Sequence, residues 1–380
     1  MDFRLTEDDL ALRQMFRDFA DKQVRPYAME IDETEQYPVE IKDKMAELGF
    51  LGLIVPECYG GSGGSHLSYA ILVEELAKAS AAVALIVSGA NCNVCGPILA
   101  YGTEAQKQHY IPPLATGQKI GSFALTESGS GSDASAMRSK AVQQGDHYVL
   151  NGTKTFISNA EYGDYFVSFV LTEGKDGKRE HTAFILEQDF PGFSVGKHEK
   201  KMGTHGIDLC ELVFEDCIIP QQNMLGNRGE GMKVALATLD AGRIGIAAVS
   251  VGMAQEAIDL TVQYTRERTQ FGKRISQFQN TQFKLAELQT QVAAARLLTY
   301  HAAWALDNGE PATQLASMAK LLASDVVNVA ARQCLQLFGG YGYTREYPIE
   351  RIYRDAKITE IFEGTSEIQK LVISRTMGVN

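Results

Sequence analysis

The spacing of apolar residues changes twice along this 380-residue chain, and these two changes constrain its fold more than any other feature. Up to about residue 118, apolar residues recur three and four positions apart, as they do in amphipathic helices. From there to about residue 228 they form short runs rich in β-branched and aromatic residues between Gly, Asp and Pro clusters, which is typical of strands. Beyond residue 228 the helical spacing returns over long stretches.

This order predicts a multi-domain α+β protein, because helices and strands are segregated along the chain. We expect an N-terminal helical domain over residues 1–118, a middle antiparallel β-barrel or sandwich over 119–228, and a C-terminal four-helix bundle over 229–380. No helical pattern separates the strand runs, so a parallel sheet is not expected. Thr6 and Thr103 are predicted N-caps of helices in the first domain.

Charge and hydropathy argue against several classes of protein. The net charge is −11, from 36 basic and 47 acidic residues, which argues against a nucleic-acid or anionic-membrane surface. No N-terminal stretch joins a basic region to an apolar run, so no signal peptide is expected. The longest charge-free window, Ala79 to Thr103, contains Ser, Asn, Gly and Pro, and it is predicted to be a buried helix rather than a membrane span.

The six cysteines and seven histidines predict neither a metal site nor a disulfide. Cys92 and Cys95 form a C-x-x-C pair, but no second pair matches it and no thioredoxin-like strand–helix pattern surrounds it. Buried free thiols are therefore expected. The histidines form no H-E-x-x-H or similar cluster, so no catalytic metal is expected. A reducing, cytoplasmic setting fits this cysteine usage.

Near its C-terminus the chain places a carboxylate among apolar neighbours, in the stretch Ile361 to Glu367. Apolar surroundings raise the pKa of Glu363 and make its anion a stronger base. Gly364 permits close approach of another molecule, and Thr365 and Ser366 offer hydroxyls to a polar ligand. Taken alone, these seven residues favour a plainer alternative, an exposed Glu at a glycine turn that ends a helix or strand.

Two stretches of the middle part could contact a polar, planar ligand. The Ser- and Gly-rich loop from Phe123 to Asp133 presents hydroxyls and backbone N–H groups, although a solvated loop is the alternative. Its segment Gly129 to Ala134 fits G-x-G-x-x-A, but more strand follows where a dinucleotide fold needs a helix, so a Rossmann site is excluded. Phe156 could stack on a ring while Ser158 bonds its edge; the alternative is a core Phe.

The C-terminal part contains three further candidates. Basic residues around Gln270-Phe271-Gly272 suit a pyrophosphate, or else form a solvated helix end; they are Arg266, Arg268, Lys273 and Arg274. Asp240 and Arg243 flank Gly242 and could form a simple surface pair. The stretch Gln336 to Tyr343 has more glycines than a helix C-cap needs, which indicates close backbone approach to a ligand or subunit.

Taken together, these stretches resemble the acyl-CoA dehydrogenase family nearly end to end. Five motifs occur in the family's order and are specific as a set: Leu125–Glu127, Gly131–Asp133, Arg268–Gly272, Gln336–Gly340 and Ile361–Thr365. The similarity is greatest to the short-chain, butyryl-CoA-type bacterial branch. The resemblance implies a homotetramer in which FAD binds noncovalently between the β domain and the C-terminal helices, with a neighbouring subunit completing the site.

The resemblance also assigns site residues. Phe156 would stack on the flavin ring, Ser158 would bond near the nitrogen that receives hydride, and Thr126 would bond the pyrimidine edge. Arg268 and Gln279 would hold the pyrophosphate region. The cofactor residues implied are Phe123, Ala124, Leu125, Thr126, Ser132, Phe156, Ile157, Ser158, Arg268, Gln279, Gln336, Leu337, Phe338, Gly339, Gly340, Thr365, Ser366 and Glu367. The substrate residues implied are Ser132, Asp240, Arg243 and Gly364.

The chemistry implied by the family makes Glu363 the base. It would remove the α-proton of an acyl-CoA thioester while the β-hydrogen leaves as hydride to the flavin. The Glu363 N–H and a flavin ribityl hydroxyl would polarise the thioester oxygen. The electrons would then pass to an electron-transferring flavoprotein. The alternatives are an enoyl-CoA reductase, an enzyme for branched or cyclic acyl-CoA, an oxidase that uses oxygen, and a catalytically silent FAD- or CoA-binding subunit.

Three positions bear on the substrate. Gly242 occupies the position at which some family members carry their base, so Glu363 has no rival carboxylate there. Phe362 precedes the base where many members have Tyr. The helix from Ala81 to Gly96, which is expected to face the acyl tail, has no cation, and this favours a neutral acyl chain over a dicarboxylic one. Bulky residues along it predict a short pocket.

Overall fold

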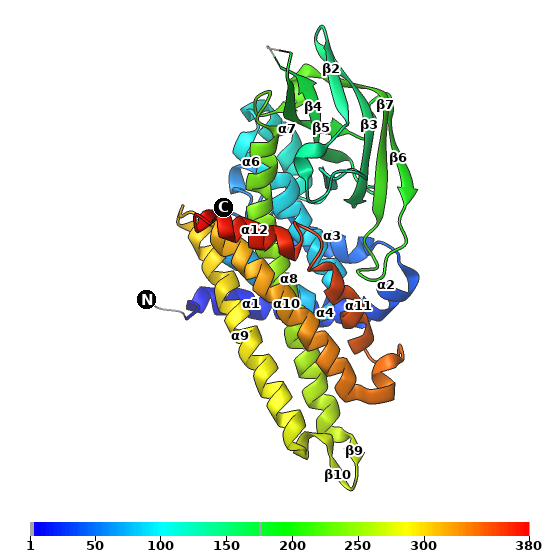
Figure 1. The fold of residues 1–380 in the computed structure, drawn as a ribbon, viewed down its shortest axis with the longest axis vertical. Helices are drawn as coiled ribbons and strands as arrows, with labels where there is room; N and C mark the ends of the chain where they lie inside the picture. Colours follow the sequence, from blue (N-terminus) through cyan, green and yellow to red (C-terminus); the bar gives the residue numbers. More distant parts are fainter. Residues whose placement is uncertain (1–3, 175–176, 380) are drawn as a thin grey trace.

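The computed structural model describes residues 4–174 and 177–379 and has three parts (Figure 1). A β-sheet forms one end of the molecule, three long helices run away from it, and the N-terminal helices pack beside both. The order of helices, sheet and helices along the chain confirms the fold class predicted from the sequence.

The N-terminal part is helical, and its helix starts follow local sequence signals. The Thr6 hydroxyl accepts from the Asp9 N–H while the Asp9 carboxylate accepts from Thr6, and Thr103 pairs with Gln106 in the same way. Both predicted N-caps are therefore confirmed. A π-helical turn, Gly89–Cys95, joins the fifth and sixth helices. The helices are α1 (Glu7–Phe19), α2 (Ala28–Thr34), α3 (Val39–Glu47), α4 (His66–Ala79), α5 (Ala81–Ser88), α6 (Gly96–Tyr101) and α7 (Glu104–Ala115).

The middle part is a mostly antiparallel sheet with the strand order β6-β7-β3-β2-β4-β5-β8. The strands are β1 (Gly121–Ala124), β2 (Lys140–Gln144), β3 (His147–Ser158), β4 (Tyr165–Glu173), β5 (Arg179–Glu187), β6 (Phe193–His198), β7 (Leu209–Pro220) and β8 (Met224–Leu225). One detail corrects the antiparallel prediction: β4 pairs in parallel with β1 and at one position with β2. The β2–β3 hairpin supplies the crossover that a helix usually provides between parallel strands, so no helical pattern was needed.

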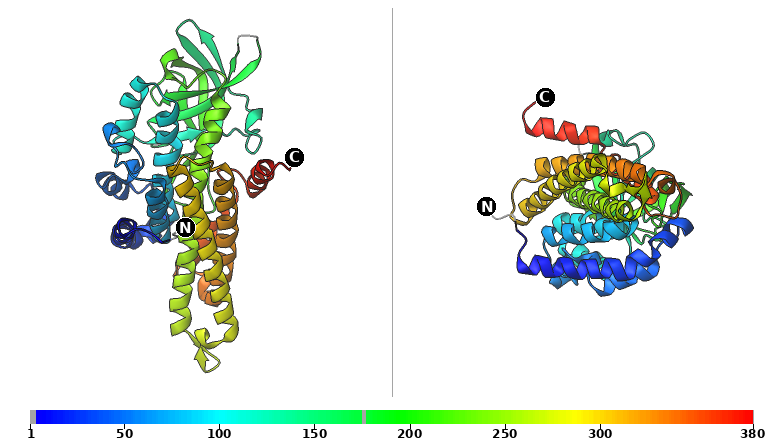
Figure 2. Two further views of the ribbon diagram at one scale, coloured as in Figure 1. Left: turned by 90° about the vertical axis from the view of Figure 1, so that its left-hand side faces the viewer. Right: turned by 90° about the horizontal axis from the view of Figure 1, so that it is seen from below.

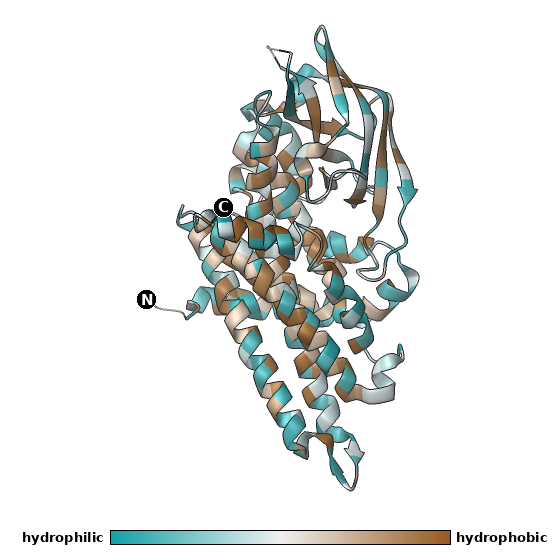
Figure 3. Ribbon diagram, in the orientation of Figure 1, coloured by the Kyte–Doolittle hydropathy of each residue, from teal (hydrophilic) through white to brown (hydrophobic). Residues whose placement is uncertain are grey.

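The C-terminal part is built on three long helices, α8 (Gly231–Glu267), α9 (Gln279–Asp307) and α10 (Thr313–Phe338). A short hairpin of β9 (Thr269–Gln270) and β10 (Lys273–Arg274) joins α8 to α9 at the end farthest from the sheet (Figure 1). Hydrophilic and hydrophobic residues alternate along these helices, as expected where one face is buried (Figure 3). Two shorter helices, α11 (Ile349–Ile358) and α12 (Ser366–Thr376), pack on α10.

Helix α8 is the central element, because it packs against α4 on one side and against α9 and α10 on the other (Figure 2). Gly252 allows the close contact with α4, since a Cβ there would lie 2.3 Å from the Glu74 carbonyl oxygen. Two segments, Ala81–Tyr101 and Gly231–Glu267, are long and apolar enough to cross a membrane, but 67% and 72% of their most apolar windows are buried within the protein. Both are core helices of this fold, in agreement with the buried helix predicted from residue 79 onward.

Candidate active site

Glu363 lies on the turn between α11 and α12, and its side chain points toward α8 and the π-helical turn. The Asn93 side-chain amide donates to Glu363 Oε1 at 2.7 Å. A Cβ built on Gly242 would lie 3.0 Å from Glu363 Oε2, so the carboxylate rests directly against the α8 backbone. Oε2 is buried and has no hydrogen-bond partner among the described residues. One carboxylate oxygen is therefore fixed, and the other is available to accept a proton.

The surroundings raise the pKa of Glu363 above its ordinary value. Burial is the largest cause, and it is opposed by the Asn93 hydrogen bond and by the positive charges of Arg243 and Lys320. A carboxylate with this environment is a stronger base than an exposed Glu, but its neighbours still favour the ionised form. The plainer alternative of an exposed Glu at a turn is therefore wrong.

The turn that carries Glu363 has left-handed backbone conformations, with φ +53° at Glu363 and +88° at Gly364. Lys320 Nζ donates to the Gly364 carbonyl oxygen at 2.7 Å. Gln369 Nε2 donates to the same oxygen at 2.8 Å and to the Glu363 carbonyl oxygen at 3.1 Å. The Glu363 N–H donates to no acceptor within the described part of the chain. That group remains available to a ligand oxygen.

Arg243 and Asp240 do not form the simple surface pair that was an alternative in the sequence. The Arg243 side chain is buried, and its Nη1 donates to Asp240 Oδ1 at 2.8 Å. Asp240 also accepts from Thr313 at 2.6 Å. This hydrogen-bonded pair places a cation beside Glu363 on the same stretch of α8 that contains Gly242.

Asn93 is a site residue that sequence reasoning missed. It lies in the π-helical turn Gly89–Cys95, a distortion that is frequent at functional sites. A polar residue in the long charge-free window was the only available signal. Burial raises the pKa of the neighbouring thiols of Cys92 and Cys95 to about 12, and both cysteines are free. The prediction of buried free thiols is thus confirmed.

The predicted flavin residues of the middle part come together at the end of β3. Phe156 has φ +58° in a β-bulge and is 56% exposed, so the alternative of a core Phe is wrong. Ile157 is buried between it and the exposed Ser158. The Thr155 N–H donates to the Thr126 carbonyl oxygen at 2.9 Å, which joins the β1 loop to this strand. An open aromatic face and free hydroxyls suit a planar ring with polar edges.

A buried ion pair beneath this surface was also missed. Lys154 Nζ lies 2.8 Å from Glu127 Oε1 and 3.1 Å from the Leu125 carbonyl oxygen. Glu127 also accepts from the backbone N–H groups of Arg138, at 2.6 Å, and Ser139, at 3.1 Å. Burial opposes ionisation, but the hydrogen bond and charge of Lys154 hold the pKa of Glu127 below its ordinary value. The pair fixes the segment that follows β1, through Leu125 and Glu127.

The remaining predicted cofactor residues lie elsewhere in the chain. Arg268 and Gln336 to Gly340 line one groove of about 440 Å³ beside the β9–β10 hairpin, whereas Gln279 is exposed outside it. Thr365 is the N-cap of α12 and lies two residues after Glu363. Ser366 and Glu367 are the first two residues of that helix. The rise of α8 between Gly242 and Glu267 is about 38 Å. One chain therefore does not bring Arg268 to Glu363, and the hairpin that begins after Arg268 lies at the end of the molecule farthest from the sheet (Figure 1). Ser132 is exposed on the loop after β1.

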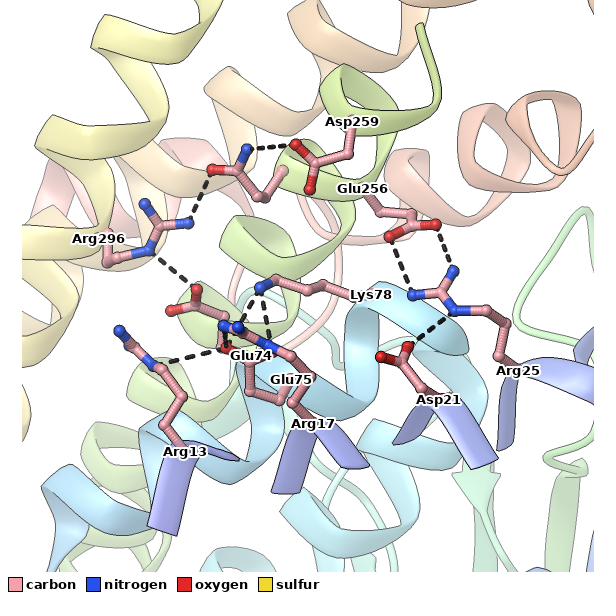
Figure 4. Close-up of a pocket in the computed structure, with 11 residues that line it drawn as sticks. Arg13, Arg17, Asp21, Arg25, Glu74, Glu75, Lys78, Glu256, Asp259 and Arg296 are labelled. Carbon is pink, nitrogen blue, oxygen red and sulfur yellow. Dashed lines mark hydrogen bonds and ion pairs between the residues drawn. The ribbon is translucent and has the colours of Figure 1, made fainter. Parts of the chain in front are cut away.

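A charged pocket of about 500 Å³ lies between α1, α4, α8 and α9 (Figure 4). Arg17 and Lys78 bind the buried Glu75 carboxylate at 3.2 and 3.0 Å. Arg25 pairs with Glu256 on α8 in the same way. Arg296 on α9 binds the buried Glu74 at 2.9 Å. We interpret the pocket as an ion-pair network that joins the N-terminal helices to the bundle, because its carboxylates face these cations.

Within the described ranges, Glu161, His198 and Cys210 bring potential metal ligands within 4.8 Å of one another. Burial, together with the charge of Asp208, raises the pKa of the Cys210 thiol to about 12. His198 Nε2 already contacts Glu161 at 2.6 Å. The thiolate that a metal would require is therefore disfavoured, and we interpret these groups as a His–Glu contact beside a buried thiol.

Family models and related proteins match nearly the whole chain. Models of the acyl-CoA dehydrogenase N-terminal, middle and C-terminal domains match residues 6–118, 122–217 and 229–378. The short-chain specific acyl-CoA dehydrogenase of Clostridium acetobutylicum is 48% identical over 375 residues, covering 98% of this chain and 99% of that protein. Subunit CarC of the caffeyl-CoA reductase-Etf complex of Acetobacterium woodii is 44% identical, covering 97% of this chain and 98% of that subunit.

The structure of butyryl-CoA dehydrogenase from Megasphaera elsdenii has a TM-score of 0.96 at 44% identity, covering 99% of this chain and 100% of that chain. The chain therefore belongs to the acyl-CoA dehydrogenase family. Within the family it lies in the short-chain branch, and it is an oxidoreductase that dehydrogenates acyl-CoA with FAD as its cofactor.

Proposed function

We propose that the protein introduces an α,β double bond into a short, neutral acyl-CoA, with Glu363 as the base. The observation that carries this proposal is the buried Glu363 carboxylate, held at Oε1 by Asn93 and free at Oε2 above Gly242. A pKa raised by burial suits proton abstraction from a weakly acidic α-carbon. The absence of a cation on Ala81 to Gly96 supports a neutral acyl tail.

The protein groups have distinct tasks in this scheme. Glu363 Oε2 takes the α-proton, and Asn93 keeps the carboxylate oriented. The free Glu363 N–H donates to the thioester oxygen, where charge develops; losing one such donor typically raises the barrier by about 3 kcal/mol. FAD, when bound, supplies the acceptor for the hydride that leaves the β-carbon. Gly364, Asp240, Arg243 and Ser132 are the proposed contacts of the acyl-CoA.

The exposed edge at the end of β3 fits the flavin ring. Phe156 is the proposed stacking partner, Ser158 and Thr126 the proposed hydrogen-bond partners, and Arg268 the proposed phosphate ligand. The further proposed contacts are Phe123, Ala124, Leu125, Ser132, Ile157, Gln279, Gln336, Leu337, Phe338, Gly339, Gly340, Thr365, Ser366 and Glu367. Solvent-accessible hydroxyls, an open ring and a groove that contains the Arg268 cation support this fit.

The separation of these residues supports an oligomer. Arg268 lies about 38 Å along α8 from the Glu363 region, so a second copy must supply the Arg268 groove if both ends hold one FAD. We take the assembly to be a homotetramer, as in the family. The proposed domains are residues 1–118, 119–228 and 229–380, supported by the ranges of the matching domain models.

An electron-transferring flavoprotein is the proposed electron acceptor, supported by the relative that is a subunit of a reductase-Etf complex. The same relative favours one alternative, an enoyl-CoA reductase of the same fold running in the opposite direction. A cytoplasmic location is proposed from the bacterial relatives and the predominance of reduced, buried cysteines.

The test is an anaerobic visible spectrum of the FAD-loaded protein before and after butyryl-CoA is added. In the wild type we expect butyryl-CoA to bleach the flavin band. In Glu363→Gln we expect FAD to remain bound and the band not to bleach. Full turnover by Glu363→Gln would refute the base assignment. A flavin that responds only to crotonyl-CoA plus a reductant would favour the reductase alternative, and peroxide formation without an acceptor protein would identify an oxidase.

A further inference from the structure

Lys320 is a buried cation on α10 to which the proposed reaction assigns no role. Its side chain is 0% exposed. Its Nζ lies 2.7 Å from the Gly364 carbonyl oxygen, and this is its only hydrogen bond within the described part of the chain. A buried ammonium group with one neutral acceptor is unfavourable for folding, so packing alone does not explain a lysine at this position.

The contact of Lys320 determines the backbone conformation next to Glu363. Glu363 and Gly364 both have positive φ, which is strained for a residue with a side chain. Lys320 and Gln369 together make three hydrogen bonds to the carbonyl oxygens of these two residues. The peptide groups that follow Glu363 and Gly364 are therefore held in place, and this restrains the turn from which the Glu363 side chain projects.

The charge of Lys320 also acts on the base. Glu363 and Glu360 from the turn, Arg243 from α8 and Asp325 from α10 are the charged groups that interact with it. Burial lowers the pKa of Lys320 to about 8, so the side chain is still mostly protonated at neutral pH. Its positive charge, with that of Arg243, opposes the effect of burial on Glu363.

We propose that Lys320 is a positioning residue for the base: it holds the left-handed turn through the Gly364 carbonyl, and its charge favours the ionised form of Glu363. This inference rests on the proposed role of Glu363. It accounts for both the hydrogen bond and the burial of a charge that weakens the fold. A role in packing alone would be met equally well by an uncharged side chain of similar length.

The test compares the pH dependence of kcat in three FAD-loaded variants. Lys320→Met is expected to lower kcat and to move the acidic limb of the profile upward by about one pH unit, a tenfold change in proton affinity. Gln369→Leu removes two hydrogen bonds from the same turn without removing a charge, so kcat should fall while the limb stays in place. Lys357→Met removes an exposed lysine that pairs with Glu360, and it should change neither kcat nor the position of the acidic limb.

The role of the charge would be overturned if the acidic limb of Lys320→Met stayed at its wild-type pH. It would also be overturned if the limb of Gln369→Leu moved as far as that of Lys320→Met. Lys320→Arg restores the charge and should return the limb to its wild-type position, which also decides the question if Lys320→Met folds poorly. An infrared difference spectrum, assigned with Glu363→Gln, measures the protonation of Glu363 without turnover. If Glu363→Gln itself remains fully active, it is the proposed function that fails rather than the effect of Lys320.

Discussion

The side-chain amide nitrogen of Asn93 lies 2.7 Å from Oε1 of Glu363, although the two residues are 270 positions apart in the chain. The contact joins a π-helical turn of the N-terminal part to the turn after α11. Because Oε1 is occupied, Oε2 is the oxygen left against Gly242. The orientation of Glu363, the proposed base, therefore depends on a residue from a different part of the chain.

Replacing Asn93 with Leu removes this hydrogen bond to the charged form of Glu363. The pKa of Glu363 should rise further, because burial would be opposed only by Arg243 and Lys320. We expect the acidic limb of the kcat profile to move upward by about one pH unit, since hydrogen bonds to charged groups contribute about 1.5–3 kcal/mol. Steady-state kinetics over about four pH units around neutrality measures this shift of the acidic limb.

Asn91→Leu is the matched control for Asn93→Leu, since Asn91 lies on the same π-helical turn. Its side chain donates to the Phe50 and Val87 carbonyl oxygens and accepts from Ile54. We expect a lower Tm from the loss of these buried hydrogen bonds and an unchanged acidic limb. A limb that moves equally in both variants would contradict a specific role of Asn93.

Gly242→Ala should impair the chemistry without unfolding the protein. The added Cβ would lie 3.0 Å from Glu363 Oε2 and 2.9 Å from Asn93 Oδ1, so the carboxylate must move away from α8. Because a misplacement of about 1 Å can cost about a hundredfold in rate, we expect kcat to fall by up to that factor. Rapid-reaction flavin reduction by butyryl-CoA measures the step directly, and FAD content with Tm provides the control. A wild-type rate would show that Oε2 does not face this residue during the reaction.

Lys320→Met should stabilise the fold at neutral pH while it impairs catalysis. The folded-state pKa of about 8 lies below the unfolded value of 10.5, so burial disfavours the protonated lysine. The resulting destabilisation, about 3 kcal/mol, is fully present below pH 8 and is relieved between pH 8 and 10.5. Urea unfolding at pH 7 and pH 10 should show an advantage of the variant that shrinks with pH. A less stable variant at pH 7 would indicate a structural role.

The sequence was sufficient for the order of the parts because hydrophobic period and capping are local properties. Thr6 and Thr103 cap their helices through residues only three positions away. The parallel pairing of β1 with β4 could not be predicted in this way. It depends on where the β2–β3 hairpin folds back, which is a contact between distant residues rather than a local preference.

The residues of the candidate site also differ in whether their signals are local in the sequence. Glu363 stands out as a candidate because its apolar neighbours and its glycine are adjacent to it in sequence, but those residues alone favour an exposed Glu at a turn, and its role as the base follows from the resemblance of five motifs to the acyl-CoA dehydrogenase family. Asn93, Lys320 and Lys154 could not be predicted, because each acts through a partner far away in the chain, and each would have passed for a solvated polar residue. The sequence also allows Arg243 to be part of a surface pair, because it gives no indication that α10 covers this side chain.

Breaking the buried Lys154–Glu127 pair should loosen the flavin loop. Lys154→Met leaves the Glu127 carboxylate without its cation, which typically costs about 3–5 kcal/mol, and FAD retention should fall with Tm. The pKa of Glu127 in the folded protein is lower than its ordinary value. The stability that the carboxylate contributes is therefore fully present above the ordinary pKa, and it is lost as the pH falls through the lowered pKa. The double variant Lys154→Met/Glu127→Leu should recover part of the Tm. Equal FAD retention in wild type and Lys154→Met, measured by gel filtration and absorbance, would contradict this role.

A subunit-mixing experiment tests whether each site is shared between two chains. Glu363→Gln and Arg268→Ala should each be inactive alone, the first through loss of the base and the second through loss of FAD. In a mixed assembly, one site receives both changes, and the other receives the intact Glu363 of one chain and the intact Arg268 groove of its partner. Because Gly242, against which Glu363 lies, is about 38 Å along α8 from the residue before Arg268, we expect co-refolded mixtures to regain up to about half of the wild-type activity per hybrid pair. Glu363→Gln mixed with Glu363→Gln/Arg268→Ala is the control and should remain inactive. Activity that does not exceed the control, in hybrids isolated through different tags, would mean that each chain holds FAD by itself.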